Sequence, residues 1–125
     1  MPKIETVNPG TPVAGPYTPG IKADNIIFIS GQGSAQSDED IKAQTLTTLN
    51  KIKMIVEKGG GSVANIVNTT VFLRNNSDFS VMNEVYKKFF NDNGVLEVYP
   101  ARATVEVSDL PLASMLIEIS AIAVL

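Results

Sequence analysis

Two charged side chains near the end of the chain have surroundings in which they could do chemistry. Arg102 lies in the stretch PARATVEV, residues 100–107, whose small and β-branched residues predict a strand. Alternation along a strand places Arg102, Thr104 and Glu106 on one face. A guanidinium in this setting needs an anionic partner. One interpretation is an ordinary surface ion pair with Glu106 or with an acid on a neighbouring strand; the other is a bound anion.

Glu118 is the second unusual residue. It lies in MLIEISAIAVL, residues 115–125, which is apolar on both faces apart from Glu118 and Ser120. A strand of this kind belongs in the middle of a sheet, where a carboxylate needs a cation, hydrogen-bond donors or a proton. Glu118 is therefore either half of a structural ion pair, with Arg102 or a lysine, or a general acid/base or water-positioning group beside an anion-binding arginine.

Three further polar residues allow both a structural and a functional interpretation. Tyr17 could pack a proline-rich arm against the rest of the protein, Ser30 stands at a strand end, and Asn83 lies on the apolar side of a predicted helix. Each of them can serve the backbone rather than a ligand. The combination of residues, rather than any single one, has to decide.

The composition narrows the possible chemistry. The chain has no cysteine and no histidine, which excludes thiolate nucleophiles, histidine-based triads and the usual zinc sites. The formal net charge is −3 and the basic residues are scattered, which argues against nucleic acid as a partner. No segment reaches the ~20 apolar residues of a membrane span, and the N-terminus has no signal-peptide pattern. We therefore expect a cytoplasmic protein without membrane association.

The 125 residues fit a single domain, residues 1–125, and their periodicity predicts the elements that must position these side chains. The proline- and glycine-rich residues 1–20 exclude a helix. Strands are predicted from residue 21 to a turn at 24–25, and over 25–31, 65–73, 101–107 and 115–124. Apolar residues at spacings of three and four predict two helices, over 37–58 and 79–90.

Some local features of these elements can also be predicted. Residues 37–40 are expected to cap the first helix and to provide an acidic first turn. The glycines at 59–61 follow that helix, so they are interpreted as a helix stop rather than as a phosphate loop, which would precede a helix. The strand over 25–31 is apolar on both faces, and we expect it to be buried inside a sheet.

Several segments together resemble the Rid family, the YjgF group of imine/enamine deaminases. They follow the family's order over nearly the whole chain: GPYT (15–18), ISGQ (29–32), Gln44, VNTTVFL (67–73), DFSVMNEVYKKFF (78–90), PARATVEVSDLP (100–111) and IEISAIAV (117–124). The resemblance implies an α+β, chorismate-mutase-like fold, a mixed β-sheet with two helices packed on one face, assembled as a homotrimer with sites between subunits. It also implies hydrolysis of reactive 2-imino acids (2-iminobutanoate, 2-iminopropanoate) to 2-keto acids and ammonia, with no cofactor and no metal.

The resemblance also implies roles for individual residues. Arg102 matches the arginine that grips the substrate carboxylate in a bidentate fork, and Glu118 matches the glutamate that holds and polarises the attacking water. The residues that match pocket-lining positions are Tyr17, Ser30, Gly31 and Asn83. Thr104 stands where the family often has cysteine, and its backbone carbonyl would hold the imine nitrogen.

The sequence departs from the family pattern at three places. The segment between Gln32 and Gln44 is several residues shorter than usual, YTPG at 17–20 replaces the commoner Tyr-Ser-Gln-Ala, and Ser120 replaces a second acid. The preferred imino acid is therefore left open. The alternatives to an imine deaminase are a non-catalytic trimer that binds small carboxylates as a sensor or regulator, and a translation inhibitor or ribonuclease. The acidic balance and the absence of histidine argue against the ribonuclease.

Overall fold

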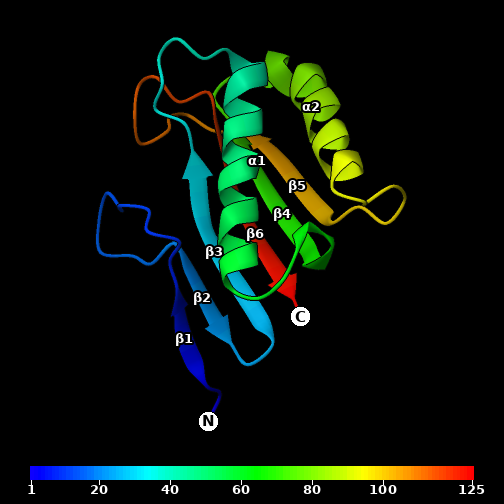
Figure 1. The fold of residues 1–125 in the computed structure, drawn as a ribbon. Helices are drawn as coiled ribbons and strands as arrows, with labels where there is room; N and C mark the ends of the chain where they lie inside the picture. Colours follow the sequence, from blue (N-terminus) through cyan, green and yellow to red (C-terminus); the bar gives the residue numbers. More distant parts are fainter.

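The computed structural model describes residues 1–125 as a six-stranded mixed sheet with both long helices on one face (Figure 1). The strands are β1 (Ile4–Val7), β2 (Gly20–Ala23), β3 (Ile26–Gly33), β4 (Ile66–Leu73), β5 (Ala101–Glu106) and β6 (Ile117–Val124). The helices are α1 (Ile41–Lys58) and α2 (Phe79–Asp92), with short 3-10 turns at Val63–Asn65 and Asn76–Asp78. The predicted α+β class and mixed sheet are confirmed.

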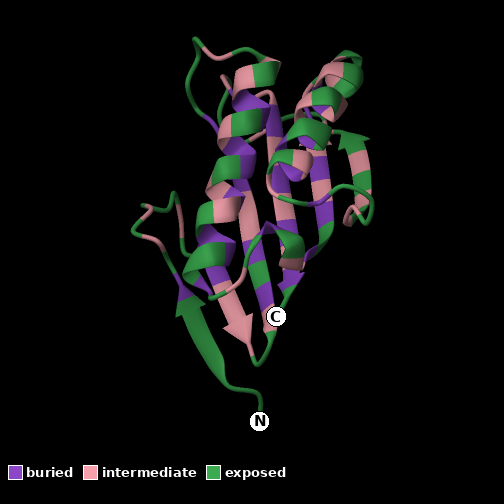
Figure 2. Ribbon diagram, turned by 45° about the vertical axis from the view of Figure 1, so that its right-hand side comes forward, coloured by how far each residue is buried: buried purple, intermediate pink, exposed green.

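The hydrophobic core lies between the two helices and the sheet, where Figure 2 shows the buried positions. Helix α1 buries Leu49, Ile52 and Val56 in this layer, and α2 buries Met82 and Phe90. These are the positions that the spacing of three and four predicts to share a face. Burial of a side chain of this size contributes about 1.5–3 kcal/mol, so the contact between helices and sheet supplies much of the stability.

The helix ends follow from local sequence, with one correction. The side chain of Asp40 accepts a hydrogen bond from the Ala43 amide (2.9 Å) and is the cap of α1, while no acid lies in the first turn. The predicted acidic first turn is therefore wrong, because 37–39 precede the helix. The helix stop is confirmed: Gly59 is the C-cap, and Gly60 has φ +95°, a conformation that favours glycine. Neither helix is long and apolar enough to span a membrane.

Strand β6 lies in the middle of the sheet, as its apolar character on both faces predicts. The strand order is β1-β2-β3-β6-β4-β5, and only the β4–β5 pair is parallel. Strand β5 is thus the edge strand next to β4 and does not form a hairpin with β6. The loop that carries the chain from β5 to β6 is held by Arg74, which donates to the carbonyls of Leu112 (3.0 Å) and Met115 (2.7 Å) and pairs with Asp109 (2.7 Å).

Two features differ from the sequence predictions. Residues 4–7 form the edge strand β1, which pairs antiparallel with β2, although the N-terminal segment carried no strand signal. Strand β3 is buried only on its helix-facing side: Ile27 and Ile29 are buried, but Phe28 is 46% exposed. The prediction of a strand covered on both faces is therefore wrong for the single chain, because nothing in it covers the sheet face opposite the helices.

Candidate active site

Arg102 extends from edge strand β5 into the space beneath α2. Its guanidinium carbon lies 4.8 Å from the ring centre of Tyr86 and 5.8 Å from that of Phe79, and one of its nitrogens is 4.0 Å from the sulfur of Met82. The ion pairs of the structure are Lys3–Glu5, Arg74–Asp109 and Lys88–Asp92. Arg102 is in none of them, so its charge is balanced by no acid of the chain.

The predicted alternative of a surface pair between Arg102 and Glu106 is wrong. The carboxylate of Glu106 instead accepts a hydrogen bond from the backbone amide of Asn76 (2.7 Å), at the start of the short turn before α2. Glu106 therefore serves the backbone, and the guanidinium is left with the rings of Tyr86 and Phe79 and the sulfur of Met82 as neighbours. This arrangement suits an arginine that is held ready for an external anion.

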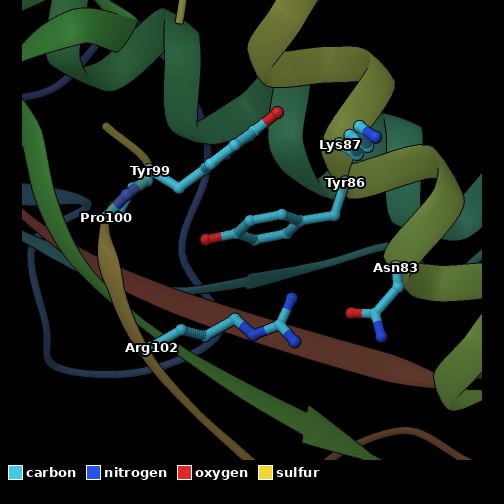
Figure 3. Close-up of a pocket in the computed structure, with 6 residues that line it drawn as sticks. All are labelled: Asn83, Tyr86, Lys87, Tyr99, Pro100 and Arg102. Carbon is cyan, nitrogen blue, oxygen red and sulfur yellow. The ribbon is translucent and has the colours of Figure 1, made fainter. Parts of the chain in front are cut away.

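The guanidinium faces a cleft of about 410 Å³. The residues that line this cleft are Asn83, Tyr86, Lys87, Tyr99, Pro100 and Arg102 (Figure 3). In Figure 3 the amide of Asn83 and the guanidinium of Arg102 point toward one another, with the Tyr86 ring beside them. The lining contains two cations and no acid, which is the electrostatic character of a site for a small anion.

Two buried polar atoms near the cleft have no hydrogen-bond partner. They are the side-chain oxygens of Asn83 and of Thr104, which is two residues after Arg102 on the same face of β5. A buried polar group without a partner costs about 1–3 kcal/mol. Such groups beside an unpaired guanidinium indicate a place where polar contacts are completed by a ligand or water. Arg102 and Asn83 thus line the same cleft, whereas Thr104 shares the face of β5 with Arg102 but is not among the lining residues.

Tyr86 is the contributor to this site that the sequence analysis missed. Its side chain is buried, and its hydroxyl is 2.7 Å from the hydroxyl of Thr69, the residue that pairs with Arg102 across β4 and β5. Burial raises the pKa of Tyr86, while the hydrogen bond to Thr69 and the charge of Arg102 act in the opposite direction. A neutral ring is thus fixed over the guanidinium. In the sequence Tyr86 has the spacing of a core residue. It follows Asn83 by three positions, so the two lie on the same side of the helix, and this spacing could have indicated that Tyr86 belongs to the site.

A second group of predicted residues lies in a separate groove. Tyr17, Gly31 and Glu118 line this groove, which has a volume of about 490 Å³. Glu118 forms no ion pair, so the predicted alternative of a structural pair with Arg102 or a lysine is wrong. Burial raises the pKa of Glu118, and a partly buried carboxylate of this kind can bind water and accept a proton.

Gly31 is the residue that makes room for Glu118. A Cβ atom at position 31 would lie 2.8 Å from the carboxyl carbon of Glu118 and closer still to one of its oxygens. Gly31 lies in the irregular part of β3, where the pairing with β6 shifts between Ile29 and Gln32. Such bulges redirect side chains next to functional sites.

Ser30 joins the N-terminal loop to this bulge. The hydroxyl of Ser30 donates to the carbonyl of Thr18 (2.5 Å), and its amide donates to the carbonyl of Pro19 (2.9 Å). Ser30 is not among the residues that line the groove, so it serves the backbone, as the structural interpretation has it. Tyr17 is 48% exposed and does not pack the arm against the core.

The two groups of residues lie on opposite faces of the sheet. Arg102 is the register partner of Thr69, whose side chain is buried beneath α2, whereas Glu118 is the partner of Phe72. Thr69 and Phe72 are three residues apart on β4, and successive side chains of a strand alternate between faces. Within one chain Arg102 therefore faces the helices and Glu118 faces the uncovered side, so a site that uses both needs a second copy of the chain.

The chemistry open to these residues follows from their types. An unpaired guanidinium can hold a carboxylate through two parallel hydrogen bonds, and a carboxylate with a raised pKa can position water. No group of three or more metal-ligating side chains occurs in residues 1–125. The free guanidinium and the partly buried carboxylate are the groups that a polar reaction on a small organic acid would use.

Comparison with known proteins gives matches over nearly the whole chain. The family model described as Endoribonuclease L-PSP matches residues 9–125. A RutC family protein of Pyrococcus horikoshii is 43% identical over 126 residues, which cover 96% of this chain and 94% of that protein. The 2-iminobutanoate/2-iminopropanoate deaminase of Escherichia coli K12 is 40% identical over 115 residues, covering 88% of each chain.

Solved structures show the same fold. The structure of the yjgF gene product of E. coli superposes with a TM-score of 0.88 at 38% identity and covers 96% of this chain and 98% of that one. E. coli TdcF, solved with bound serine, superposes with a TM-score of 0.85 at 38% identity and covers 98% and 97%. The similarity therefore extends over nearly the whole chain.

Proposed function

The chain belongs to the Rid family, the YjgF and RutC proteins, and on that premise we propose that it hydrolyses reactive 2-imino acids to 2-keto acids and ammonia. The proposed substrates are small, of the size of 2-iminobutanoate and 2-iminopropanoate, which a relative with 40% identity is named for. We place this activity in the cytoplasm, in a single domain that needs no cofactor.

Arg102 binds the substrate carboxylate in this proposal. The support is the free guanidinium at the cleft, with its aromatic neighbours and without any acid within ion-pair distance. A planar carboxylate fits the guanidinium fork, and the amide of Asn83 faces the same space. TdcF, whose structure contains bound serine, provides a relative with an amino-acid carboxylate as ligand. Thr104 would contribute its backbone carbonyl to the imine nitrogen.

Glu118 positions the water that attacks. The carbon of a C=N bond is already electrophilic, so the reaction needs a held carboxylate, a protonated nitrogen and a placed water. Glu118, whose pKa is raised by burial, accepts a proton as the water oxygen bonds to the imine carbon. The carboxyl group then passes this proton to the nitrogen. As the C–N bond breaks, the new hydroxyl group gives its proton to the Glu118 carboxylate and becomes the keto oxygen, and the departing ammonia takes up that proton as ammonium. Tyr17 and Gly31 would form the wall around this water, while Ser30 holds the neighbouring loop through the carbonyl of Thr18.

A complete site requires two subunits, and we propose that the chain assembles as a homotrimer with a site at each interface. Arg102 and Glu118 lie on opposite sheet faces, so the arginine of one subunit would meet the glutamate of the next. The uncovered sheet face, with Phe28 exposed, would be the surface that the assembly buries. Oligomers of this closed kind commonly bury an apolar face.

The test combines turnover with binding. 2-Iminobutanoate is generated from threonine by a dehydratase, and formation of 2-ketobutanoate above the spontaneous rate is measured. Arg102→Lys keeps the charge but loses the fork, so we expect a loss of kcat/KM of roughly 10- to 100-fold, from charged hydrogen bonds of about 1.5–3 kcal/mol. Lys22→Met, which changes a lysine of β2 outside the lining of the Arg102 cleft, is the control.

The outcomes separate the alternatives. No acceleration by the intact protein removes the enzymatic proposal, and calorimetric binding of 2-ketobutanoate without turnover would favour the carboxylate sensor. An Arg102→Lys variant with full activity would remove the role of the guanidinium fork. A sedimentation experiment that finds only monomers in an active preparation would contradict the proposed shared site.

A further inference from the structure

The Arg102 cleft contains a second cation whose charge the proposed reaction does not use. Lys87 lines the cleft from α2 and is exposed at its mouth. Neither Lys87 nor Arg102 belongs to an ion pair, and none of the six lining residues is an acid. A monocarboxylic imino acid satisfies one of these two positive charges and leaves the other unmatched.

The next residue shows that this arrangement is specific to position 87. Lys88 pairs with Asp92 one turn later (2.8 Å) and lines a different groove, between α1 and α2. Lys88 is therefore neutralised on the outer surface of the helix, as is common for exposed lysines spaced four residues from an acid. Lys87 has no such partner and contributes its charge to the Arg102 cleft.

The position of Lys87 defines where a second anion would lie. Lys87 is four residues after Asn83, so the two share one side of α2 and are separated by about 6 Å along the helix. Arg102 points at Asn83, and in Figure 3 Lys87 lies on the other side of the Tyr86 ring. The carboxyl carbons of a four- or five-carbon dicarboxylic acid are about 4–5 Å apart, given C–C bonds near 1.52 Å. Because Arg102 and Lys87 line the same cleft and a lysine side chain is long and flexible, the Lys87 ammonium can reach the distal carboxylate of such an acid past the Tyr86 ring.

We propose that the cleft accepts dicarboxylic 2-imino acids, the imines of acidic amino acids, with Arg102 on the carboxylate next to the imine and Lys87 on the distal carboxylate. Lys87 is then a specificity-determining residue. This inference rests on the proposed function and adds a substrate class to it. The bonds made and broken are unchanged: water adds to the C=N carbon, ammonia leaves, and the product is a dicarboxylic 2-keto acid.

The experiment compares two substrates in three proteins. 2-Iminoglutarate is generated from glutamate by an amino-acid oxidase, 2-iminobutanoate is generated from threonine, and kcat/KM is measured for the wild type, Lys87→Met and Lys88→Met. The expected result is a loss of roughly threefold to fivefold for 2-iminoglutarate in Lys87→Met alone, the size of a partly screened ion pair. In Lys87→Met, kcat/KM for 2-iminobutanoate should stay within about twofold of the wild-type value. Added salt should reduce the ratio of kcat/KM for 2-iminoglutarate to that for 2-iminobutanoate in the wild type.

Binding of 2-oxoglutarate and 2-ketobutanoate by calorimetry keeps the inference separate from the proposed function. If neither imine is turned over but 2-oxoglutarate binds more weakly to Lys87→Met than to the wild type, the cleft specificity stands and the enzymatic proposal fails. If both imines are hydrolysed and Lys87→Met lowers kcat/KM equally for both substrates, or for neither of them, the role of Lys87 is overturned. An equal effect of Lys88→Met would show a general charge effect and would also overturn it.

Discussion

Replacing Gly31 with alanine should displace the Glu118 carboxylate while leaving the protein folded. The added methyl group would lie 2.8 Å from the carboxyl carbon of Glu118 and 3.1 Å from its Cγ. Gly31 does not have a positive φ, so alanine is compatible with the backbone. The atoms in conflict belong to the outer part of a flexible side chain, which can rotate away at little cost in stability. The substitution therefore tests position rather than folding.

The size of the effect follows from the contact distance. An ordinary carbon contact at this site is 3.4 Å or more, so the carboxyl carbon must move by about 0.6 Å. A displacement of about 1 Å in a catalytic group can cost 10²-fold in rate. We therefore expect kcat for 2-iminobutanoate to fall by about 10- to 100-fold. Binding of 2-ketobutanoate should change by less than about twofold, because its carboxylate is held by Arg102 and not by the displaced Glu118.

Gly15→Ala is the matched control. A Cβ at Gly15 would have its nearest neighbours 3.8 Å away in the ring of Tyr17, so the same change near the same groove meets no conflict. Turnover is measured for both variants beside thermal unfolding. The reasoning is refuted if Gly31→Ala unfolds at the wild-type temperature and turns over substrate at the wild-type rate. An equal loss in Gly15→Ala would also refute it, since a general sensitivity of the loop would then explain both.

Three further predictions concern Tyr86, Glu118 and Arg74. Tyr86→Leu removes the ring over Arg102 and should weaken 2-ketobutanoate binding several-fold in calorimetry, because a cation–π contact contributes about 0.5–2 kcal/mol; Tyr86→Phe should retain binding. Glu118→Gln should raise the unfolding temperature at neutral pH but not in acid. Burial raises the pKa of Glu118 in the folded protein, so the stability contributed by the protonated carboxyl group is present at low pH and is lost as the pH rises through the folded-state pKa. Arg74→Met should lower the free energy of unfolding in urea by about 1–3 kcal/mol through its lost bonds to backbone carbonyls. Asp109→Asn should lower it by less than Arg74→Met does, because the Asp109 side chain is exposed.

Each of these predictions has an outcome that contradicts it. Equal binding by Tyr86→Leu and the wild type would show that the ring does not position Arg102. An advantage of Glu118→Gln that is the same at acid and neutral pH would mean that its charge plays no part. If Asp109→Asn lowered the free energy of unfolding more than Arg74→Met does, the ion pair and not the backbone hydrogen bonds of Arg74 would hold the loop between β5 and β6.

The elements of the fold were largely predictable because their periodicity is clear. The helices are amphipathic, and β6 is apolar on both faces, which correctly predicts its central place. Strand β1 was missed because its residues, IETV, are mostly exposed and it is defined only by pairing with β2. The exposure of Phe28 could not be predicted either, since it depends on which surfaces the single chain leaves uncovered.

The candidate site was predictable in its residue types but not in its arrangement. Arg102 and Glu118 were recognisable as charges in strands, yet only the folded structure shows that neither has an ion-pair partner. Tyr86 looks like any core residue in the sequence, because its contact with Arg102 depends on how α2 crosses β5. Arg102 and Glu118 face opposite sides of the sheet because of the way β5 and β6 are aligned with β4. Alternation shows which residues of one strand share a face, but it does not show how the faces of two strands correspond.

The placement of Arg102 and Glu118 on opposite sheet faces has a consequence for inheritance and for mixtures. Under the proposed assembly, a chain without the Arg102 guanidinium and a chain without the Glu118 carboxylate are each inactive alone. In a mixed trimer, some interfaces would combine the intact Glu118 of the first chain with the intact Arg102 of the second, and these sites would be active. Two damaged alleles in one cell would therefore complement each other. Dilution below the concentration at which subunits associate would abolish turnover while each separate chain still kept its fold.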